Sequence, residues 1–534
     1  MGKFDYVIVG AGSAGCVLAY RLSENPANKV LLIEAGPSDD HPFIHMPKGI
    51  GKIMANMRYV WPYMTTKAPS TNDTEEFFGR GKTLGGSSAI NGMMYVRGQD
   101  ADYDELAALT SDDWSWKHIG AAYKALENHE LGAAETRGDS GPLHVTMPDI
   151  RDPITDATIE AAIAMGMERR EDVNSPEDGE RAGYAPRTVY KGKRESAARA
   201  FLNPIRSRPN LTIVTAVTVD KIELEDKRAV AVIGSRNGEA VRYEASREVI
   251  LCAGALGSPA ILQRSGIGPA DHLRAIGVNV LHDSPGVGAN LREHRALVMQ
   301  WKTKTPEVSQ NREYTGLRLV KNVMEYYLKR SGPMSAATYE AGAWFKTRPE
   351  LDRPDGQLLI APYTFDFESG AVKVEDHGGI NICAYILRPE SSGTVLAKSA
   401  NPEDLPLISP NFHALEVDRK KMVDVLRYTR ALMARPEVAP LIDSETRPGA
   451  AYDSDEEIIA AFDQMGNGAY HASGSVTMGP GDDAPLDTRL RVKGIDGLRV
   501  ADTSIMPFIV AGNTNGPAMA MAWRGADLIL EDAG

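Results

Sequence analysis

The chain has 534 residues, of which 43% are hydrophobic and 25% charged, which is typical of a globular protein rather than a fibrous or disordered one. Its formal net charge is -13 and it contains no long run of lysine or arginine, which argues against nucleic acid as a partner. No uncharged apolar run reaches the ~18 residues that a transmembrane helix needs.

The three cysteines, Cys16, Cys252 and Cys383, lie far apart in the sequence. Their spacing forms no CxxC pair and no metal motif, so we predict neither a disulfide scaffold nor a metal site. Unpaired cysteines fit a reducing compartment. The first residues, MGKFDYVIVG, enter a strand pattern directly and show no signal peptide. We therefore expect a cytoplasmic protein without a membrane-spanning segment.

The N-terminal residues follow the order strand, glycine turn, helix, strand. Residues 6–9 are apolar and predict the first strand, residues 16–22 have helical spacing, and residues 29–33 form a second apolar run that ends before Glu34. The turn between the first strand and the helix has the pattern GxGxxG. Together these features predict a βαβ unit that binds the phosphates of a dinucleotide.

Each residue type in this turn suits contact with a dinucleotide. Gly10 permits the tight turn, Gly12 lets the backbone approach a pyrophosphate, and Gly15 lets the helix pack against the strand. The helix N-terminus faces the phosphates, and Glu34 is placed to accept hydrogen bonds from the adenosine ribose. No second turn of this kind follows, so we expect one dinucleotide and disfavour enzymes that hold both FAD and NADPH. The predicted contacts from this unit are Gly10, Gly12, Ser13, Ala14, Gly15, Glu34 and Ala35.

The rest of the chain gives coarser predictions. Residues 210–222 and 248–253 predict strands. Helices are predicted near 317–328 and 415–435, with a strand-rich stretch at 356–398 between them. This mixture of strands and helices predicts a mixed α/β fold.

Several further stretches resemble the signature sequences of one enzyme family. Residues 81–104, GKTLGGSSAINGMMYVRGQDADYD, are similar to the first signature of the glucose–methanol–choline (GMC) oxidoreductases, and residues 254–268, GALGSPAILQRSGIG, to the second. The tail blocks YHASGSVTMG and LRVADTSIMPFIVAGNTNGPAMAMA match the rest of the family pattern in the same order. The resemblance covers essentially the whole chain. The stretch from Ile44 to Thr66 is more similar to bacterial choline-, sorbose- and aryl-alcohol-type dehydrogenases than to fungal secreted oxidases.

The resemblance implies a doubly wound, Rossmann-like FAD-binding domain (α/β, or α+β mixed over the whole chain) together with a substrate domain that has an antiparallel sheet and flanking helices. We expect the FAD-binding domain to be assembled from residues 1–155, 206–297 and 463–534, the last segment carrying the catalytic residues. The substrate domain is expected from residues 156–205 and 298–462, inserted between those segments.

The same resemblance implies FAD as the cofactor. The loop rich in glycine and serine after Gly81 would run along FAD, because bare backbone lets N–H groups approach a planar ring and a pyrophosphate closely. Some family members attach FAD through a histidine directly after the motif asparagine, Asn91; here that residue is Gly92, so we expect non-covalent FAD. The further contacts implied by the family are Trp61, Gly81, Leu84, Gly85, Gly86, Ser87, Asn91, Gly92, Met93, Met94, Val219, Asp502, Thr514 and Asn515.

Of the 11 histidines, His471 alone falls at the position of the family's catalytic histidine. A histidine suits a base that takes a hydroxyl proton near neutral pH. Asn513 falls at the paired position, and an amide can hold the substrate oxygen but cannot take its proton. We therefore predict His471 as the base and Asn513 as the residue that orients the alcohol. Asn515 is expected to cap the tail helix, with Pro517 in its first turn, so that the helix N-terminus stabilises reduced flavin by about 0.3–1 kcal/mol.

These residues predict FAD-dependent oxidation of a primary alcohol to an aldehyde, with a dehydrogenase favoured over an oxidase. Two alternatives remain: a hydroxynitrile-lyase-like enzyme that keeps FAD without redox chemistry, and a flavin-binding protein without catalysis. The identity of the alcohol, the electron acceptor (oxygen, a quinone or an electron carrier) and the oligomeric state are left open. Tyr363, Phe365 and Trp344 are candidates for the substrate pocket, although aromatic residues in strand-rich segments are as often ordinary core.

Overall fold

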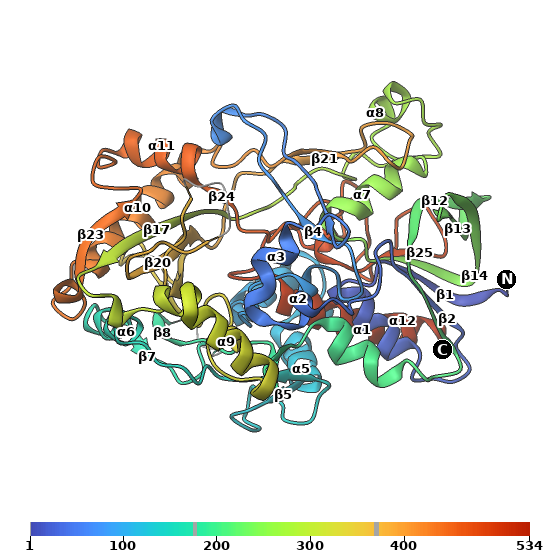
Figure 1. The fold of residues 1–534 in the computed structure, drawn as a ribbon. Helices are drawn as coiled ribbons and strands as arrows, with labels where there is room; N and C mark the ends of the chain where they lie inside the picture. The colour runs from blue at the N-terminus through green and yellow to red at the C-terminus, as the bar shows by residue number, and fades with distance from the viewer. Residues whose placement is uncertain (1, 175–178, 368–372) are drawn as a thin grey trace.

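The computed structural model describes residues 2–174, 179–367 and 373–534. Its two large sheets lie on opposite sides of the molecule (Figure 1). Residues 368–372 of the strand-rich stretch predicted at 356–398 lie outside the described residues, as do residues 175–178.

The first sheet is a parallel core that is extended by an antiparallel hairpin. In the described part of the chain its order is β11-β2-β1-β14-β13-β12, and β25 from the tail pairs with β14. The pairs among β11, β2, β1, β14 and β25 are parallel, whereas β12, β13 and β14 are antiparallel. The strands are β1 (Phe4–Val9), β2 (Val30–Ile33), β11 (Leu211–Val214), β12 (Val217–Glu225), β13 (Arg228–Arg236), β14 (Glu239–Leu251) and β25 (Leu498–Val500).

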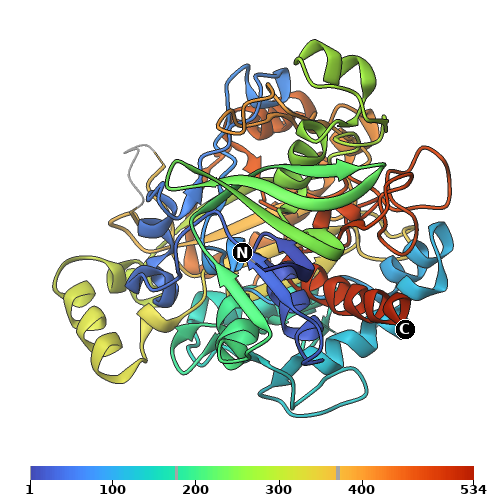
Figure 2. The ribbon, with the colours of Figure 1, turned by 90° about the vertical axis from the view of Figure 1, so that its right-hand side faces the viewer.

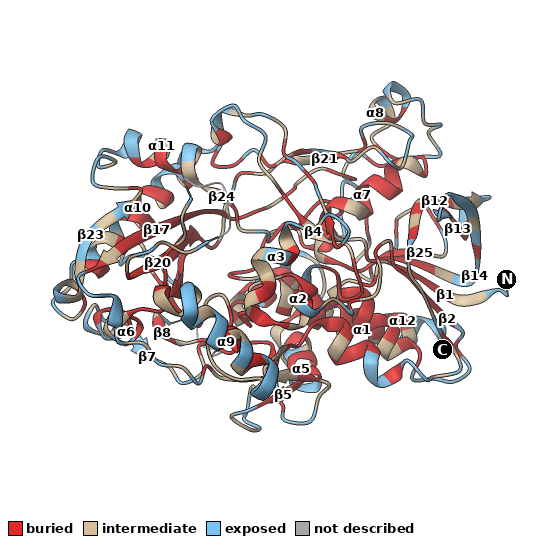
Figure 3. Cartoon of the chain, viewed as in Figure 1, coloured by how far each residue is buried: buried red, intermediate tan, exposed pale blue. Residues whose placement is uncertain are grey.

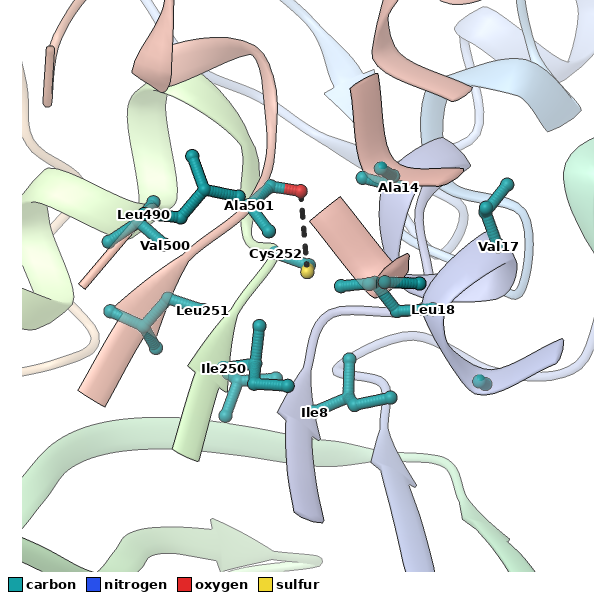
Figure 4. Packing of buried hydrophobic residues seen from close by; sticks show 14 of the residues in the cluster. Ile8, Ala14, Val17, Leu18, Ile250, Leu251, Cys252, Leu490, Val500 and Ala501 are labelled. Atoms are coloured by element: carbon teal, nitrogen blue, oxygen red, sulfur yellow. Dashed lines mark hydrogen bonds between the residues drawn. The ribbon is translucent and has the colours of Figure 1, made fainter. Parts of the chain in front are cut away.

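The parallel strands are continuous hydrophobic runs because other elements cover the faces of this part of the sheet. Helix α1 (Ser13–Leu22) packs beside α12 (Asn515–Ala533), and Figure 2 shows this pairing of the two ends of the chain. Figure 4 shows Ile8 and Ile250 on neighbouring strands, with Leu18 of α1 close by and the Cys252 thiol donating to the Ala501 carbonyl. The first and last segments of the chain therefore share one core.

The second sheet has the order β23-β17-β20-β19-β18-β8-β7 among the described residues, with β24 paired to β17. Its pairs are antiparallel except for β7 and β8. Helices α6 (Pro153–Ala164), α10 (Glu416–Met433) and α11 (Asp455–Met465) supply apolar residues to the core on one face of this sheet. The strands are β7 (Glu168–Arg169), β8 (Arg181–Tyr184), β17 (Arg295–Thr303), β18 (Ala341–Phe345), β19 (Gly356–Ala361), β20 (Gly379–Ile386), β23 (Ile442–Arg447) and β24 (Asn467–Gly468).

This architecture confirms the predicted fold class, and two predicted helices are confirmed as α9 (Gly316–Lys329) and α10. The single strand predicted at 210–222 is wrong. The chain breaks at Ala216, whose φ is 58° and whose N–H donates to the Gly36 oxygen at 3.0 Å, so β11 and β12 are separate. The hairpin from β13 to β14 turns at Asn237 and Gly238, both with positive φ, a turn sequence that does signal a hairpin.

Figure 3 shows the buried residues concentrated in the sheets and in helices such as α1 and α7, while α9 is exposed along one side. Among the described residues, none of the helices combines the length and the apolar character that crossing a membrane requires. Other elements are α2 (Pro42–His45), α3 (Ile50–Met54), β3 (Val60–Trp61), β4 (Arg80–Gly81), α4 (Asp100–Leu109), α5 (Trp116–Leu126), α7 (Gly254–Arg264) and α8 (Ala270–Ala275).

Candidate active site

A cavity of about 900 Å³ connects the parallel sheet with the inner face of the antiparallel sheet. Its wall includes the β1–α1 turn at Gly12, the loop around Ser87, strand β12 at Val219, and Cys383 of β20. The loop that carries His471 belongs to the same wall. Segments from the beginning, the middle and the end of the chain therefore meet at one site.

Most residues that the sequence predicts as cofactor contacts line this cavity. The two predicted catalytic residues, His471 and Asn513, line it as well. The structure thus brings the separate motifs together, while the individual contacts with FAD stay predictions. The predicted cofactor contacts in the wall are Gly10, Gly12, Ser13, Ala14, Glu34, Ala35, Trp61, Gly81, Gly86, Ser87, Asn91, Gly92, Met93, Met94, Val219, Asp502, Thr514 and Asn515.

Gly15, Leu84 and Gly85 differ from that group, since they pack behind the wall. A Cβ added at Gly15 would lie 1.9 Å from the Gly10 oxygen, so the helix and the turn are in contact there. The N–H of Gly85, whose φ is 87°, donates to the Ala11 oxygen at 2.7 Å, and Leu84 is buried. These residues hold the loop against the GxGxxG turn.

The carboxylate of Glu34 also shapes the turn. It accepts hydrogen bonds from the N–H of Ala11 at 3.0 Å and from the N–H of Gly36 at 2.8 Å. Burial raises the pKa of Glu34 to about 7, although the amide donors around it act in the opposite direction. Glu34 therefore has a structural task in the protein beside the ribose contact that the sequence predicts.

The start of the tail helix differs from the prediction. Helix α12 begins at Asn515 and is preceded by Thr514, so the expected cap residue is instead the first residue of the helix. The Asn515 side chain does not bond to its own helix; its Oδ1 accepts from the Ser13 hydroxyl at 2.7 Å. This bond ties the first turn of α12 to the first turn of α1, so two helix N-termini lie together at the cavity wall.

His471 and Asn513 are in direct contact. The Asn513 Nδ2 lies 3.1 Å from the His471 Nε2, and both residues line the cavity. Asn513 Oδ1 accepts from the Gln357 Nε2 at 3.4 Å, and the Gln357 Oε1 accepts from the Tyr385 hydroxyl at 2.8 Å. Because each amide oxygen is held by a donor, the Asn513 amide group presents its NH₂ side to His471.

The other ring nitrogen of His471 faces a second histidine. The Nδ1 atoms of His471 and His294 are 2.9 Å apart, and the His294 Nε2 lies 2.8 Å from the Leu387 carbonyl oxygen. Burial lowers the pKa of His294 to about 4, so this ring is neutral. A carbonyl only accepts, so the proton of His294 is on Nε2, and its Nδ1 is an acceptor.

These contacts assign the tautomer of His471. Its Nδ1 must carry a proton that is donated to His294, so Nε2 is unprotonated and its lone pair accepts from the Asn513 NH₂ on the side of the cavity. Burial lowers the pKa of His471 well below its usual range, and the neighbouring His294 and Arg80 lower it further. The ring is therefore neutral at neutral pH and can accept a proton at Nε2.

Glu293 holds the backbone around the two histidines. Its Oε1 accepts from the N–H of His471 at 2.7 Å and from the N–H of His294 at 3.0 Å, while its Oε2 lies 3.3 Å from the Arg80 Nη2. Burial raises the pKa of Glu293 to about 7, and Arg80 acts against that shift. The carboxylate is fully engaged with protein groups beneath the cavity.

The sequence of the chain matches a known enzyme family. Its sequence matches the GMC oxidoreductase family, through the N-terminal model over residues 4–296 and the C-terminal model over residues 389–522. The chain belongs to this family. It is 37% identical over 537 residues to an alcohol dehydrogenase (acceptor) of Pseudomonas putida, covering 99% of this chain and 96% of that one.

Other GMC oxidoreductases give the same picture. The chain is 38% identical over 539 residues to an oxygen-dependent choline dehydrogenase of Stenotrophomonas maltophilia (strain K279a), covering 99% of this chain and 95% of that one. The fold matches pyridoxine 4-oxidase from Mesorbium loti with a TM-score of 0.89, 30% identity and 99% coverage of both chains. These matches confirm the predicted family and an enzyme of the FAD-dependent oxidoreductase class.

The protein fits the FAD that GMC oxidoreductases bind. A Cβ on Gly86 would lie 2.7 Å from the Gly12 Cα, so the loop and the turn meet through bare backbone at the N-terminus of α1. Asp502 lines the cavity and accepts from the N–H of Gly254 at 2.8 Å and from the Ser258 hydroxyl at 2.6 Å. Within the described ranges, no group of three His, Cys, Asp or Glu side chains is arranged for a metal ion.

The residues that support His471 and Asn513 could not be predicted from the sequence. His294, Glu293, Gln357 and Tyr385 carry no local motif, and they reach the site only because β17, β19 and β20 pair side by side. Of the three aromatic candidates for the substrate pocket, Phe365 lines the cavity. Trp344 and Tyr363 are buried outside that wall. Trp344 belongs to a core cluster, and the Tyr363 hydroxyl donates to the Thr338 carbonyl at 2.7 Å.

Proposed function

We propose that this GMC oxidoreductase oxidises a primary alcohol to an aldehyde, with His471 as the base that takes the hydroxyl proton. The observation that carries the proposal is the unprotonated Nε2 of His471, which accepts from the Asn513 NH₂, with both residues in the wall of the cavity. The names of the relatives, an alcohol dehydrogenase and choline dehydrogenases, agree with an alcohol as substrate.

His471, Asn513 and His294 have different roles in this reaction. The alcohol replaces the direct bond between His471 and Asn513. Its hydroxyl donates to His471 Nε2, and the Asn513 NH₂ donates to the alcohol oxygen and stabilises its developing negative charge. The proton moves to His471, whose Nδ1–H keeps its bond to His294, so the positive ring remains oriented. When bound, FAD supplies the acceptor for the hydride that leaves the alcohol carbon.

FAD would be held through its phosphates at the N-terminus of α1 and by the backbone around Gly86. We infer non-covalent binding, because Gly92 in the cavity wall has no side chain that could bond to the flavin. The N-terminus of α12, at Thr514 and Asn515, is placed in the same wall and would favour the negative charge of reduced flavin. A cytoplasmic location stays a prediction from the cysteine usage.

The proposal is tested by one visible spectrum of the purified holoprotein, repeated without oxygen after addition of a panel of primary alcohols. At least one alcohol should bleach the flavin bands, because hydride transfer reduces the flavin. Readmitted air then separates an oxidase from a dehydrogenase by the speed with which the colour returns. Cleavage of a cyanohydrin with flavin bands that no alcohol bleaches would contradict the proposal and favour a lyase.

A pair of substitutions at His294 tests the tautomer assignment. His294→Phe removes the acceptor for the His471 Nδ1–H and should lower kcat/KM roughly tenfold or more, a part of what general base catalysis contributes. His294→Gln can present an amide oxygen to the same proton and should retain more activity than the Phe variant. Stopped-flow flavin reduction over a pH series measures both; equal rates in the Phe variant and the parent would contradict the assignment.

A further inference from the structure

The wall of the cavity near His471 is formed by one face of the antiparallel sheet. Val298 of β17 pairs with Cys383 of β20, and Cys383 pairs with Leu359 of β19, so the three residues form a row across the sheet. All three line the cavity, whereas their neighbours Leu297 and Leu358 belong to the core on the opposite face. Directly paired residues project to the same face of a sheet, so this row is a continuous apolar surface.

The row lies next to the reacting groups. Two residues along β20 from Cys383 is Tyr385, whose ring centroid is 5.8 Å from that of His471. Two residues along β19 from Leu359 is Gln357, which donates to Asn513. A substrate whose hydroxyl reaches His471 and Asn513 therefore places the rest of its body along this row. Other side chains in the wall are uncharged too: Met94, Thr338, Tyr339, Phe365 and Ala469.

The carboxylates of the cavity wall do not belong to the row of Val298, Cys383 and Leu359. Among the described residues that line the cavity, the carboxylates are Glu34, Asp404 and Asp502. Glu34 holds the GxGxxG turn, and Asp502 bonds to the start of α7. Asp404 accepts from the Ser399 hydroxyl. Its neighbour Glu403 is close enough to Asp220 to raise the pKa of that carboxyl, so this part of the wall lies near Val219 of β12.

The charged side chain of the wall that acts on His471 is a cation, Arg80. Its partner Glu293 is buried beneath the cavity and accepts from two backbone amides. A positive group of the substrate would thus meet an arginine and apolar side chains, without a counterion. Burial of an unpaired charge in such surroundings is far more costly than burial of a neutral group of the same shape. Cation–π attraction to the rings of Tyr339 and Phe365, worth about 2 kcal/mol when desolvated, offsets only part of this cost.

We infer that the alcohol taken by this enzyme is uncharged, with an apolar body that packs on Val298, Cys383 and Leu359, and that alcohols bearing a quaternary ammonium group are excluded. This inference rests on the proposed alcohol oxidation and narrows its substrate class. It separates the chain from the relatives named as choline dehydrogenases, despite their 36% to 39% identity.

The test compares two alcohols of one shape on the FAD-loaded enzyme. Choline carries a trimethylammonium group, and its neutral isostere, neohexyl alcohol, carries a tert-butyl group in the same place. The second-order rate of anaerobic flavin reduction should be about 100-fold or more higher with the neutral isostere, because only choline loses its hydration without a partner. Equal rates, or a higher rate with choline, would overturn the inference and leave the proposed function standing.

Two variants of Leu359 test whether the positive charge of choline is the reason for its exclusion. Leu359→Glu places a carboxylate in the apolar row and should raise the ratio of choline to isostere about tenfold or more, whereas Leu359→Gln, of nearly equal size, should not. Equal ratios in both variants would contradict a charge-based exclusion. Cleavage of cyanohydrins without flavin reduction by either alcohol would overturn the proposed function and this inference with it.

Discussion

Replacement of His471 by alanine is expected to lower the rate of alcohol oxidation by about 10²–10⁴-fold, the contribution of a positioned general base. Of this pair, the imidazole is the group with an unprotonated basic nitrogen, since the Asn513 NH₂ can only donate. The variant should still bind FAD, because the dinucleotide turn and the loop around Gly86 do not depend on this side chain. Single-turnover flavin reduction and the flavin-to-protein absorbance ratio measure the two effects.

The pH profile provides a second readout of the same group. The neutral ring is the active form and the pKa of His471 is lowered, so kcat/KM of the parent should stay level down to the ordinary histidine pKa and fall only below it. That acid limb should be missing from the residual activity of the variant. His118→Ala is a matched control, since His118 lies on α5 beside Asp112 and away from the cavity. Parent-like turnover by His471→Ala would refute the assignment of the base.

The sequence predicts those parts of the site whose residues lie close together in the chain. The GxGxxG turn needs a strand, a bend and a helix within a few residues, so its pattern survives in the sequence. His471 and Asn513 belong to blocks that resemble a family signature, and they meet in the structure although 42 residues separate them. The prediction of Asn515 as a cap was wrong by one position, because Thr514 precedes the helix and Asn515 bonds to Ser13 instead.

The residues that escaped prediction act through tertiary pairing. His294 lies 177 residues from His471 in the chain, and its ring reaches Nδ1 of His471 only after β17 pairs with β24 and β20. A histidine at the start of an apolar strand looks like any buried histidine in the sequence. Trp344 shows the reverse case, since an aromatic residue in a strand-rich segment proved to be part of the core.

Alanine at Gly12 is expected to prevent FAD binding without destabilising the fold, whereas alanine at Gly15 is expected to destabilise the fold. Gly12 has a φ of -78°, and the nearest atom to an added Cβ is 4.0 Å away, so the protein has room for it. The loss of a glycine cap and the gain from a stiffer unfolded chain nearly cancel, so unfolding of the apoprotein should change by less than about 1 kcal/mol. The added methyl group occupies the cavity, and FAD should no longer bind.

Gly15→Ala should instead weaken the fold. Its Cβ would lie 1.9 Å from the Gly10 oxygen, and both atoms are fixed by the strand, the turn and the helix. Such overpacking costs about 1–3 kcal/mol, more than the roughly 1 kcal/mol by which alanine favours a helix over glycine. Urea unfolding of the apoproteins and titration with FAD separate the two cases. If Gly12→Ala bound FAD like the parent, the pyrophosphate would not approach the backbone at Gly12, because the methyl group leaves no room for both.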